Sequence, residues 1–380
     1  MFYILQWSYE PNTASENRMQ AYLKAMDELG FEATVVYLYP GSKYEKNPNE
    51  FKHIRLIYYW NHYTPYRGFF RKFTFNQYMR KFLKLLKRGD IVYTYHINKL
   101  ISIVQGINGV HTFAEMTEHP KASDGIDNPV LYIKDEERIS IGKKLDGLIV
   151  ISDALRQYFV SEGLDIRRVH VINMLADASR FIGLSKSTNC EKYIAYCGNA
   201  SNNKDGVDEL IKAFSLVAKK HDEFKLYLIG KRPGIDDNSG NLELVRELGV
   251  EEKVKFVGLV PSDRIPQLLT DATILALDRP DSLQAKYGFP TKLGEYLLTK
   301  NPVVVTKVGD IPLFLTHKFD AMLAEERNPR DFADSLNWII EHPDDAMKIG
   351  SNGFEAALRS FNSTVEVSKL IAIFQNITHE

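Results

Sequence analysis

The sequence predicts an α/β protein of two doubly wound domains, each built on a parallel sheet with helices on both faces. Short apolar runs alternate with amphipathic segments along the chain, which is the pattern of βαβ units. The 380 residues exceed what one core serves, because single cores stop growing near about 250–300 residues. A Ser-, Lys- and Asn-rich stretch at 183–191 separates the halves. We therefore expect domains at 1–185 and 186–355, with a C-terminal helix in 356–380 that can pack back on the first domain.

The strands and helices of the first half are predicted from the types and the spacing of its residues. Apolar runs too short for helices indicate strands, and stretches with apolar residues three or four apart indicate helices. The expected strands are Phe2–Gln6, Ala33–Tyr39, His53–Tyr59, Ile91–Tyr95, Val110–Met116, Gly147–Ser152 and Val169–Ile172. The expected helices are Ser15–Leu29, Phe75–Leu86, Leu131–Lys144 and Asp153–Ser161.

The second half alternates more regularly. Its expected strands are Tyr193–Cys197, Lys225–Ile229, Val254–Val257, Thr273–Leu277, Val303–Thr306 and Ala321–Leu323. Its expected helices are Val207–Lys219, Asn241–Leu248, Asp263–Leu269 and Lys292–Thr299, followed by three helical segments within Arg330–Phe374. Ligands of such sheets bind outside the carboxyl ends of the strands, so the loops that follow the strands are the places to look for a site.

Composition narrows the class of protein. The chain is 44% hydrophobic and 26% charged with a net charge of −1, which excludes a disordered chain, a collagen-like chain and a surface built wholly for nucleic acid. The two cysteines, Cys190 and Cys197, are too few for a disulfide framework and indicate a reducing, cytoplasmic compartment. We expect no signal peptide and no membrane span, since Met1 leads directly into a strand and no apolar stretch reaches about 18 residues.

Two loops of the second half have the composition of a phosphate site. Residues 198–206 lead from a strand into a helix and combine small residues with Lys204. Small residues let a backbone approach a ligand, and a helix N-terminus favours an anion. Gly230 and Arg232 follow the next strand in the same way. The alternative for both loops is a solvated surface turn, and neither has the spacing of a Walker loop or a dinucleotide fingerprint.

The most informative stretch follows the 273–277 strand. A helix is expected to begin near Pro290, because proline suits the first helical turn. The amides around Gly288-Phe289 would then face a ligand. Lys292 and Glu295 lie three residues apart on this helix, so they can reach one ligand or form an ion pair with each other.

This stretch resembles the donor-binding domain of the family 4 glycosyltransferases, which are retaining enzymes with the GT-B fold of two Rossmann-like domains facing across a cleft. The family has a Glu-x7-Glu signature with Gly-Phe-Gly at its middle and a Pro-Val-Val strand downstream. Here Gly288-Phe289 stand in place and Asn301-Pro302-Val303-Val304 follow. The resemblance implies that Glu295 holds the ribose hydroxyls of a nucleotide sugar.

The signature also departs from the family. Tyr287 stands where the first glutamate is expected, and Pro290 replaces the second glycine. The loss of the first glutamate removes the usual carboxylate contact to the donor sugar. Asp278 or Asp281 can substitute for it.

The phosphate loop resembles the same family independently. Members read Gly-Arg-x-x-x-x-Lys-Gly, in which the cations neutralise the diphosphate of the donor. Gly198 and Lys204 stand at the matching spacing, while Asn199 replaces the arginine. Arg232 or Lys292 can supply the missing charge.

Two further segments extend the resemblance. The segment 254–260 is similar to the strand whose trailing backbone, here at Val260, brackets the base of the donor. The segment 146–181 resembles the family's route out of the first domain. The resemblance therefore covers roughly residues 146–312, and the preceding part of the chain matches only as an alternating pattern.

The loops of the first half are expected to serve the acceptor. Residues 11–18 resemble the family's first loop, which makes Ser15 and Arg18 candidates for acceptor or phosphate contacts; the alternative is a helix start capped by Ser15. Glu118 and His119 follow a later strand and can assist proton transfer or hold sugar hydroxyls, the alternative being a solvated loop. The remaining histidines of this half that we considered are expected to be packing or surface residues: His62, His96, His111 and His170.

The resemblance implies a retaining transfer of a sugar from a UDP-, GDP- or ADP-sugar to a glycan or lipid-linked acceptor, as in bacterial cell-surface polysaccharide or glycoconjugate synthesis. The leaving diphosphate must be stabilised as the glycosidic bond breaks, and fixed cations can do this. No Asp-x-Asp motif is present, so we expect Lys204 to act in place of a metal ion, with no separate cofactor. Retention without a carboxylate nucleophile then implies that the leaving phosphate helps to deprotonate the acceptor.

One segment departs from charge neutrality. Residues 67–88 contain no Asp or Glu, and Phe and Leu alternate with basic residues. This pattern is typical of a helix on an anionic membrane surface, here the inner face; the alternative is a core stripe of Phe and Leu with solvated cations. Nucleic acid is not expected as a partner, because no recognised module accompanies the run. The basic residues are Arg67, Arg71, Lys72, Arg80, Lys81, Lys84, Lys87 and Arg88.

Two other classes of protein remain as alternatives. A catalytically silent GT-B protein acting as a binding partner is suggested by Tyr287 and Asn199, which replace charged residues of the family. A nicotinamide-dependent oxidoreductase would need a G-x-G-x-x-G turn after an early strand, with an acidic residue about 20 positions later, and the sequence has neither in place.

Overall fold

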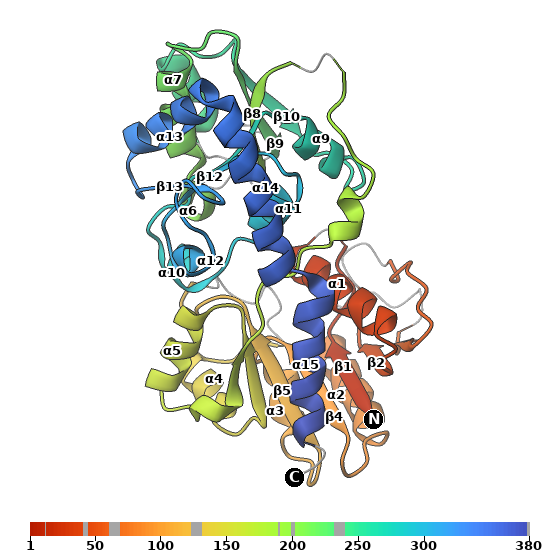
Figure 1. Ribbon diagram of the computed structural model, residues 1–380. Helices are drawn as coiled ribbons and strands as arrows, with labels where there is room; N and C mark the ends of the chain where they lie inside the picture. The colour runs from red at the N-terminus through yellow and green to blue at the C-terminus, as the bar shows by residue number, and fades with distance from the viewer. Residues whose placement is uncertain are drawn as a thin grey trace. The chain divides into compact units, whose positions relative to one another are not determined.

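The computed structural model describes residues 1–11, 13–40, 45–60, 69–122, 131–188, 191–198, 202–231 and 240–377, without the side chains of 69–72. The chain forms two compact units. Unit 1 comprises Met1–Leu175 and Ser363–Glu380, and unit 2 comprises Ala176–Asn362. Each unit has one sheet with helices packed against it (Figure 1).

The sheet of unit 1 has the strand order β3-β2-β1-β4-β5-β6-β7, and neighbouring strands run parallel. Its strands are β1 (Phe2–Gln6), β2 (Ala33–Tyr37), β3 (Ile54–Tyr58), β4 (Ile91–Tyr95), β5 (His111–Met116), β6 (Gly147–Val150) and β7 (Val169–Val171). The order reverses between β1 and β4, whose register pairs Phe2 with Ile91 and Ile4 with Tyr93. Doubly wound sheets bind ligands at the carboxyl end of such a reversal.

The helices of unit 1 bury apolar faces against this sheet. They are α1 (Ala14–Glu28), α2 (Phe69–Leu83), α3 (Lys99–Val104), α4 (Asp135–Gly142), α5 (Asp153–Ser161) and α15 (Ser363–Ile377), with the 3-10 turn η1 (Ile166–Arg168). The C-terminal helix α15 packs beside α1 (Figure 1). It places the ring centroid of Phe374 4.6 Å from that of Phe2 and 4.9 Å from that of Phe113. The core of unit 1 therefore depends on the last helix of the chain.

The start of α1 corrects one detail of the sequence analysis. Thr13, and not Ser15, caps the helix: the Thr13 hydroxyl accepts a hydrogen bond of 3.2 Å from the amide of Glu16. Thr13 has extended backbone angles, which suit a capping residue, whereas Ser15 is already inside the helix. The cap directs Glu16 and Arg18 inward, and both are buried.

The sheet of unit 2 has the order β10-β9-β8-β11-β12-β13, also with parallel neighbours, and reverses between β8 and β11. Its strands are β8 (Tyr193–Gly198), β9 (Lys225–Gly230), β10 (Val254–Gly258), β11 (Ile274–Leu277), β12 (Val303–Thr306) and β13 (Met322–Ala324). Its helices are α6 (Asn202–Asp205), α7 (Val207–Val217), α8 (Asn241–Glu247), α9 (Ile265–Asp271), α10 (Leu283–Tyr287), α11 (Thr291–Leu298), α12 (Ile311–Phe314), α13 (Pro329–Glu341) and α14 (Pro343–Ser360).

The units divide between Leu175 and Ala176, before the stretch at which the sequence suggested a boundary. The 3-10 turn η2 (Ala178–Phe181) is anchored in unit 2, because Arg180 forms an ion pair with Glu295 and donates a hydrogen bond of 2.8 Å to the carbonyl of Ser262. Ser187 is held in the same unit by Asp271, whose carboxylate accepts a 2.8 Å bond from its amide. The second division lies between Asn362 and Ser363.

Helix α2 contains the basic segment and begins earlier than the expected Phe75. Phe75, Met79 and Phe82 are buried in the core, so part of the apolar stripe has a structural role. Phe73 and Leu85 remain exposed, at 65% and 40%. Five basic residues from this helix and the turn after it are exposed as well: Arg80, Lys81, Lys84, Lys87 and Arg88.

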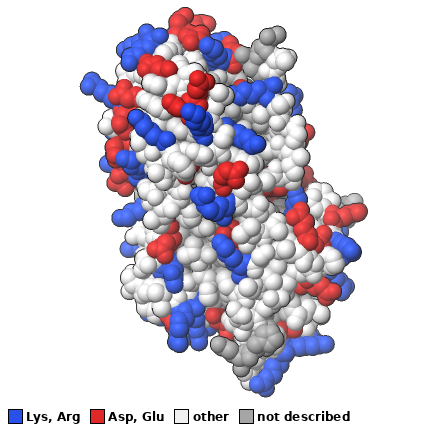
Figure 2. All heavy atoms as spheres, in the orientation of Figure 1, with Lys and Arg blue, Asp and Glu red and all other residues white. Residues whose placement is uncertain are grey.

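On the face drawn in Figure 2, Lys and Arg side chains are interspersed with Asp and Glu, as expected for a net charge of −1. No helix in the described residues is both long and apolar enough to cross a membrane.

Candidate functional site

The carboxyl ends of β8 and β9 bring two of the predicted site residues together. Gly198 and Gly230 are register partners at the last positions of these strands. Gly230 has φ = +141°, and a Cβ there would lie 1.8 Å from the carbonyl oxygen of Gly198. A side chain at residue 230 is therefore incompatible with this close approach of the two strand ends. The two glycines therefore end their strands at close range, next to the strand reversal of unit 2.

A buried ion pair lies at this edge. The Lys292 ammonium, from α11, is 2.6 Å from Oδ2 of Asp205, at the end of α6, and the Tyr196 hydroxyl donates a 2.7 Å hydrogen bond to the same oxygen. A Cβ on Gly198 would come within 2.7 Å of the Lys292 Nζ, so the glycine also makes room for the lysine. The ion pair thus connects α11, which carries the predicted family signature, with the predicted phosphate loop at residues 198–206.

The electrostatics of this cluster are dominated by cations. Burial lowers the pKa of Lys292, Asp205 opposes the shift, and the charges of Arg279 and Lys204 lower it further. Burial disfavours the charged form of Asp205, but Lys292, hydrogen bonds and Arg279 outweigh it and lower its pKa. Three cations, Lys204, Lys292 and Arg279, therefore act on the region that holds the carboxylate of Asp205. Such an arrangement favours an anionic ligand.

Glu295 has a partner that sequence reasoning did not anticipate. Its carboxylate forms an ion pair with Arg180 of η2, not with Lys292 on its own helix. Burial raises the pKa of Glu295, and Arg180 acts against that shift. The carboxylate and its helix neighbour Lys292 are thus fixed by two different elements, which argues against the expected alternative of an i,i+3 ion pair.

The segment between α10 and α11 differs in part from expectation. The Gly288 amide donates a 3.0 Å hydrogen bond to the carbonyl of Gln284 and closes α10, so it does not face a ligand as predicted. The Phe289 ring is buried and packs against Phe314 and Phe361, with centroids 5.4 and 5.3 Å away. Tyr287 is half-buried and has the Lys286 ammonium 5.9 Å from its ring centroid.

The two proposed substitutes for the missing glutamate differ in burial. Asp278 follows β11, is 2% exposed, and its burial together with Glu209 and Asp208 raises its pKa to about 8. Its backbone carbonyl would lie 1.9 Å from a Cβ on Gly206, which has φ = +56°. Asp281 is exposed. A buried carboxyl group that is mainly protonated at neutral pH can donate a hydrogen bond, whereas Asp281 is an ordinary surface residue.

The remaining predicted donor residues are not all described. Val260, the candidate for the base contact, is half-buried just after β10. Asn199, Arg232 and His62 lie outside the described residues, as do Arg67 and the side chains of Arg71 and Lys72.

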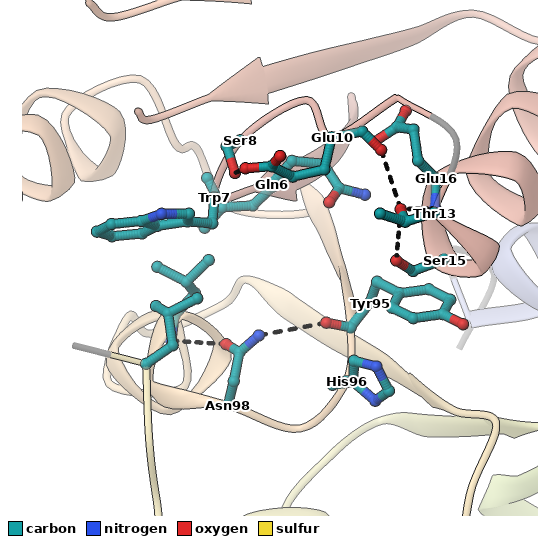
Figure 3. A pocket seen from close by; sticks show the side chains of 13 residues that line it. Gln6, Trp7, Ser8, Glu10, Thr13, Ser15, Glu16, Tyr95, His96 and Asn98 are labelled. Atoms are coloured by element: carbon teal, nitrogen blue, oxygen red, sulfur yellow. Dashed lines mark hydrogen bonds between the residues drawn. The ribbon is translucent and has the colours of Figure 1, made fainter. Parts of the chain in front are cut away.

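Unit 1 has a pocket at the carboxyl ends of β1 and β4, where its own strand order reverses (Figure 3). The β1 side contributes Gln6, Trp7, Glu10 and Glu16, and the β4 side contributes His96 and Asn98 among others. Ser15, one of the predicted residues, also lines it, and its hydroxyl lies 3.2 Å from that of Thr13. The pocket combines carboxylates, amides and an indole ring.

His96 is the main correction in this unit, because the sequence analysis expected a packing or surface histidine. It lines the pocket and has φ = +67°, a conformation that non-glycine residues rarely adopt. Burial lowers its pKa to about 4 although Glu118 and Glu115 act in the opposite direction. Its imidazole is neutral at physiological pH and can both donate and accept a hydrogen bond. Its position directly after a strand was the signal that could have identified it.

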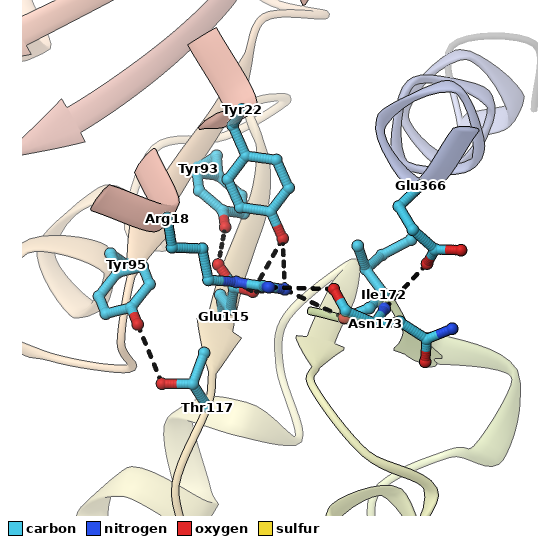
Figure 4. A network of polar contacts seen from close by, with 9 residues as sticks. All are labelled: Arg18, Tyr22, Tyr93, Tyr95, Glu115, Thr117, Ile172, Asn173 and Glu366. Atoms are coloured by element: carbon cyan, nitrogen blue, oxygen red, sulfur yellow. Dashed lines mark hydrogen bonds and ion pairs between the residues drawn. The ribbon is translucent and has the colours of Figure 1, made fainter. Parts of the chain in front are cut away.

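Arg18 does not face a ligand, contrary to the prediction. Its guanidinium is buried and donates to Glu115, Tyr22 and the carbonyls of Ile172 and Asn173 at distances of 2.7 to 3.0 Å (Figure 4). Tyr22 and Tyr93 also donate to the Glu115 carboxylate, which is fully buried. The guanidinium nitrogens of Arg18 and both carboxylate oxygens of Glu115 thus have hydrogen-bond partners. The network therefore holds α1, β4, β5 and the end of β7 in position.

The two catalytic candidates after β5 have different surroundings. His119 is 5% exposed, its Nδ1 accepts a 3.1 Å hydrogen bond from the amide of Lys121, and its ring lies 4.1 Å from that of Tyr158. Burial lowers its pKa, so it is a packed, neutral histidine. Glu118 is half-buried, and its charge acts on His96 and Tyr95, which line the pocket. Of the two, Glu118 is the one near the site.

Comparison with known proteins finds a family match in the part of the chain that contains the cation cluster. The family described as "Glycosyl transferases group 1" matches residues 191–342, which lie in unit 2 and include Lys204, Lys292 and Glu295. Mannosylfructose-phosphate synthase of Agrobacterium fabrum is 24% identical over 281 residues, covering 69% of this chain and 60% of that protein. A D-inositol 3-phosphate glycosyltransferase of Corynebacterium aurimucosum is 25% identical over 207 residues, covering 54% and 45%. The chain spans about half the length of these two relatives.

The fold has a solved counterpart along its whole length. Anabaena HepE, crystallised with UDP and glucose, superposes with a TM-score of 0.72 at 17% identity, covering 98% of this chain and 99% of that one. At this identity the likeness shows the fold, which is GT-B. Within unit 2, residues 191–342 match the model of the group 1 glycosyl transferases. The resemblance drawn from the sequence motifs is thereby confirmed.

Proposed function

We propose that the protein is a retaining glycosyltransferase that moves a hexose from a nucleotide-sugar donor to a glycan or lipid-linked acceptor. The observation that carries the proposal is the cation cluster of Lys204, Lys292 and Arg279 beside the glycine edge of β8 and β9. A diphosphate matches this site in charge, and the backbone edge permits close approach. The match of the same segment to group 1 glycosyl transferases supports the assignment.

Each donor contact has a candidate residue. The diphosphate would be held by Lys204 and Lys292, with the backbone at Gly198 and Gly230, and the ribose hydroxyls by Glu295. Arg180 would then have to share or release the Glu295 carboxylate, since it forms the ion pair in the structure without donor. The base would lie against the backbone that follows β10, at Val260.

The reaction needs stabilisation of the departing diphosphate more than it needs a nucleophile. As the bond from the anomeric carbon to the phosphate oxygen breaks, positive charge develops on the sugar and negative charge on the leaving group. Lys204 and Lys292 lie where fixed positive charge would favour this separation. A leaving phosphate oxygen would accept the proton of the acceptor hydroxyl, and the new glycosidic bond would form on the same face of the sugar.

Substitution of Lys204 tests the proposal directly. We expect Lys204→Ala to lower the turnover of transfer by about 10²–10³-fold, the usual effect of removing one transition-state electrostatic contact. Lys220→Ala, at an exposed lysine past the end of α7, is the matched control and should leave the rate unchanged. Near-native transfer by Lys204→Ala would refute the role. Activity should also survive a chelator, and strict dependence on a divalent ion would contradict the proposed role of the lysines.

The nucleotide is identified by thermal-shift measurements with UDP, GDP and ADP, followed by their sugar conjugates. A ligand that binds only the folded state raises the melting temperature by mass action. The expected result is stabilisation by one nucleotide that is lost in Lys204→Ala and kept in Lys220→Ala.

A second candidate function is a catalytically silent GT-B protein that binds a partner. It is favoured by the ion pair that occupies Glu295 and by Tyr287 in place of the expected glutamate. The two functions differ in one measurement: the silent protein binds a nucleotide sugar without releasing the nucleotide by transfer or hydrolysis. Release of free nucleotide above the rate of Lys204→Ala would exclude it.

We also propose that the exposed face of α2 and the turn after it bind the inner face of an anionic membrane, where lipid-linked acceptors are found. The exposed cations Arg80, Lys81, Lys84, Lys87 and Arg88 surround the exposed side chains of Phe73 and Leu85. Sedimentation with anionic but not neutral vesicles is expected, and reversal of Lys84 and Lys87 to Glu should abolish it. Failure to sediment with either vesicle would contradict this localisation.

A further inference from the structure

The pocket of unit 1 has a chemistry that goes beyond the proposed transfer reaction. It lies at the strand reversal of β1 and β4, and its walls come from the connections that follow these two strands (Figure 3). The Trp7 ring stacks on Tyr39, with centroids 4.3 Å apart and planes 14° apart. One face of the indole is therefore fixed by Tyr39, and the ring is held rigidly where it lines the pocket.

Two acidic side chains line the same pocket. Glu16 is 6% exposed and accepts a 2.6 Å hydrogen bond from Gln20, which fixes its orientation. Glu10 is half-buried and accepts a 3.3 Å bond from the hydroxyl of Ser8. Gln6 and Asn98 add amide groups to the wall. Carboxyl oxygens accept hydrogen bonds, so these two side chains match the hydroxyl groups of a ligand.

The combination is that of a site for an uncharged sugar. An aromatic face takes the apolar C–H surface of a sugar ring, while carboxylates and amides take its hydroxyls. A phosphate group carries about −1.5 to −2 charges at neutral pH, so the charge of Glu10, together with that of Glu16 in its ionised form, repels it. Unit 2 has a cluster of cations beside β8. By contrast, the described residues that line this pocket include no Lys or Arg.

We propose that this pocket binds the acceptor through an uncharged sugar residue and selects against the phosphate ester of the same sugar. The proposal rests on the proposed glycosyltransferase function, and it sets this chain apart from relatives whose names include a sugar phosphate or inositol phosphate. Glu10 and Glu16 determine the selection, and Trp7 supplies the binding surface.

The test uses matched pairs of probes with the full-length protein: glucose and glucose 6-phosphate, fructose and fructose 6-phosphate, and myo-inositol and inositol 3-phosphate. Binding is followed by tryptophan fluorescence, without a donor. At least one neutral member should bind, at least tenfold more tightly than its ester. Trp7→Phe should remove the fluorescence change, whereas Trp338→Phe, in unit 2, should preserve it. Equal or tighter binding of the ester by the native protein would overturn the proposal, and so would binding of none of the neutral probes.

A charge reversal tests the role of Glu10 specifically. Glu10→Lys should shift the preference toward the ester by at least tenfold, and Glu10→Gln should shift it less. Glu32→Lys is the control, because Glu32 is exposed and precedes the amino end of β2, away from the pocket. An unchanged preference in a folded Glu10→Lys protein would contradict the inference.

A second readout separates this proposal from the proposed function. Release of the nucleotide from the sugar conjugate that stabilises the protein in the thermal-shift measurements should rise with the neutral probes and not with the esters, expressed as kcat/KM for the probe. Selective binding of neutral sugars without any nucleotide release would support the pocket assignment and refute the glycosyltransferase assignment. If an ester raised nucleotide release most, the result would support the glycosyltransferase assignment and refute the pocket assignment.

Discussion

The carboxyl edge of the unit 1 sheet at β1 and β4 differs from that of the unit 2 sheet at β8 and β11 in the side chains around it. Both are strand reversals in parallel sheets. Around β8 lie Lys204, Lys292 and Arg279, with two glycines at the strand ends. Around β1 lie the carboxylates of Glu10 and Glu16 and the indole of Trp7.

The difference teaches that topology decides where a ligand binds and a few side chains decide which ligand. Doubly wound sheets bind ligands at the carboxyl ends of the strands where the strand order reverses, and both edges meet this condition. In our proposals, the sign of the local charge directs an anionic donor to unit 2 and an uncharged acceptor to unit 1. The predictions below test how far each edge depends on its charges.

The largest effect is expected from Lys292→Met. It leaves the Asp205 carboxylate buried without its ion-pair partner, which typically costs about 3–5 kcal/mol of unfolding free energy, and it removes a donor contact. The double variant Lys292→Met with Asp205→Asn should regain most of the stability, measured by urea unfolding, but not the affinity for the nucleotide. Recovery of nucleotide affinity in the double variant would show that Lys292 only neutralises Asp205.

A smaller effect is expected from Glu16→Gln in the acidic pocket. Burial raises the pKa of Glu16 to about 7 in the folded protein, above its usual 4.5. Its contribution to stability is therefore complete below pH about 4.5 and is lost as the pH rises to about 7. Glu16→Gln should be more stable than the native protein at pH 8 by up to about 3 kcal/mol, with the gap closing toward pH 4.5.

Unfolding curves of the native protein and of Glu16→Gln at pH 4.5, 6 and 8 measure this gap. A constant gap across the three pH values would mean that the Glu16 carboxylate is not strained by burial. It would also weaken the view that the pocket maintains a negative charge at a cost in stability.

The smallest effect concerns salt. Raising NaCl from 50 to 500 mM should weaken nucleotide binding at unit 2 by about three- to tenfold, since attraction between charges is screened. Binding of a neutral sugar at unit 1 should change by less than about twofold. Calorimetric titrations of both ligands provide the measurement, and equal salt responses would remove the electrostatic distinction between the two edges.

The elements of the fold were predictable because their signals are local. Each described strand overlaps an apolar run recognised in the sequence, and β1, β4 and β12 agree at both ends. The short helices α6, α10 and α12 were not expected, because four or five residues are too few to show a helical period. The start of α2 was misplaced because Arg71 and Lys72 interrupt its apolar pattern.

The candidate site was predictable only in part. Gly198, Lys204, Gly230 and Lys292 lie together because strand ends in one parallel sheet share an edge, which spacing and strand assignment can anticipate. The burial of Arg18 was not predictable, since its partner Glu115 is 97 residues away in sequence.

The same difficulty applies to two other residues. The pairing of Glu295 with Arg180 joins positions 115 apart, and no local pattern reports such a contact. His96 was set aside because a single histidine has many structural roles, whereas its place after β4 relates it to the reversal only once the strand order is known.

The return of α15 to the first sheet has a consequence for synthesis of the chain. Val367, Leu370 and Phe374 complete the core of unit 1, yet they are translated after the whole of unit 2. Residues 176–362 can thus complete their core on the ribosome while the first 175 residues still lack a helix. Domains usually fold in the order in which they emerge, but here the part that is made first must be finished last.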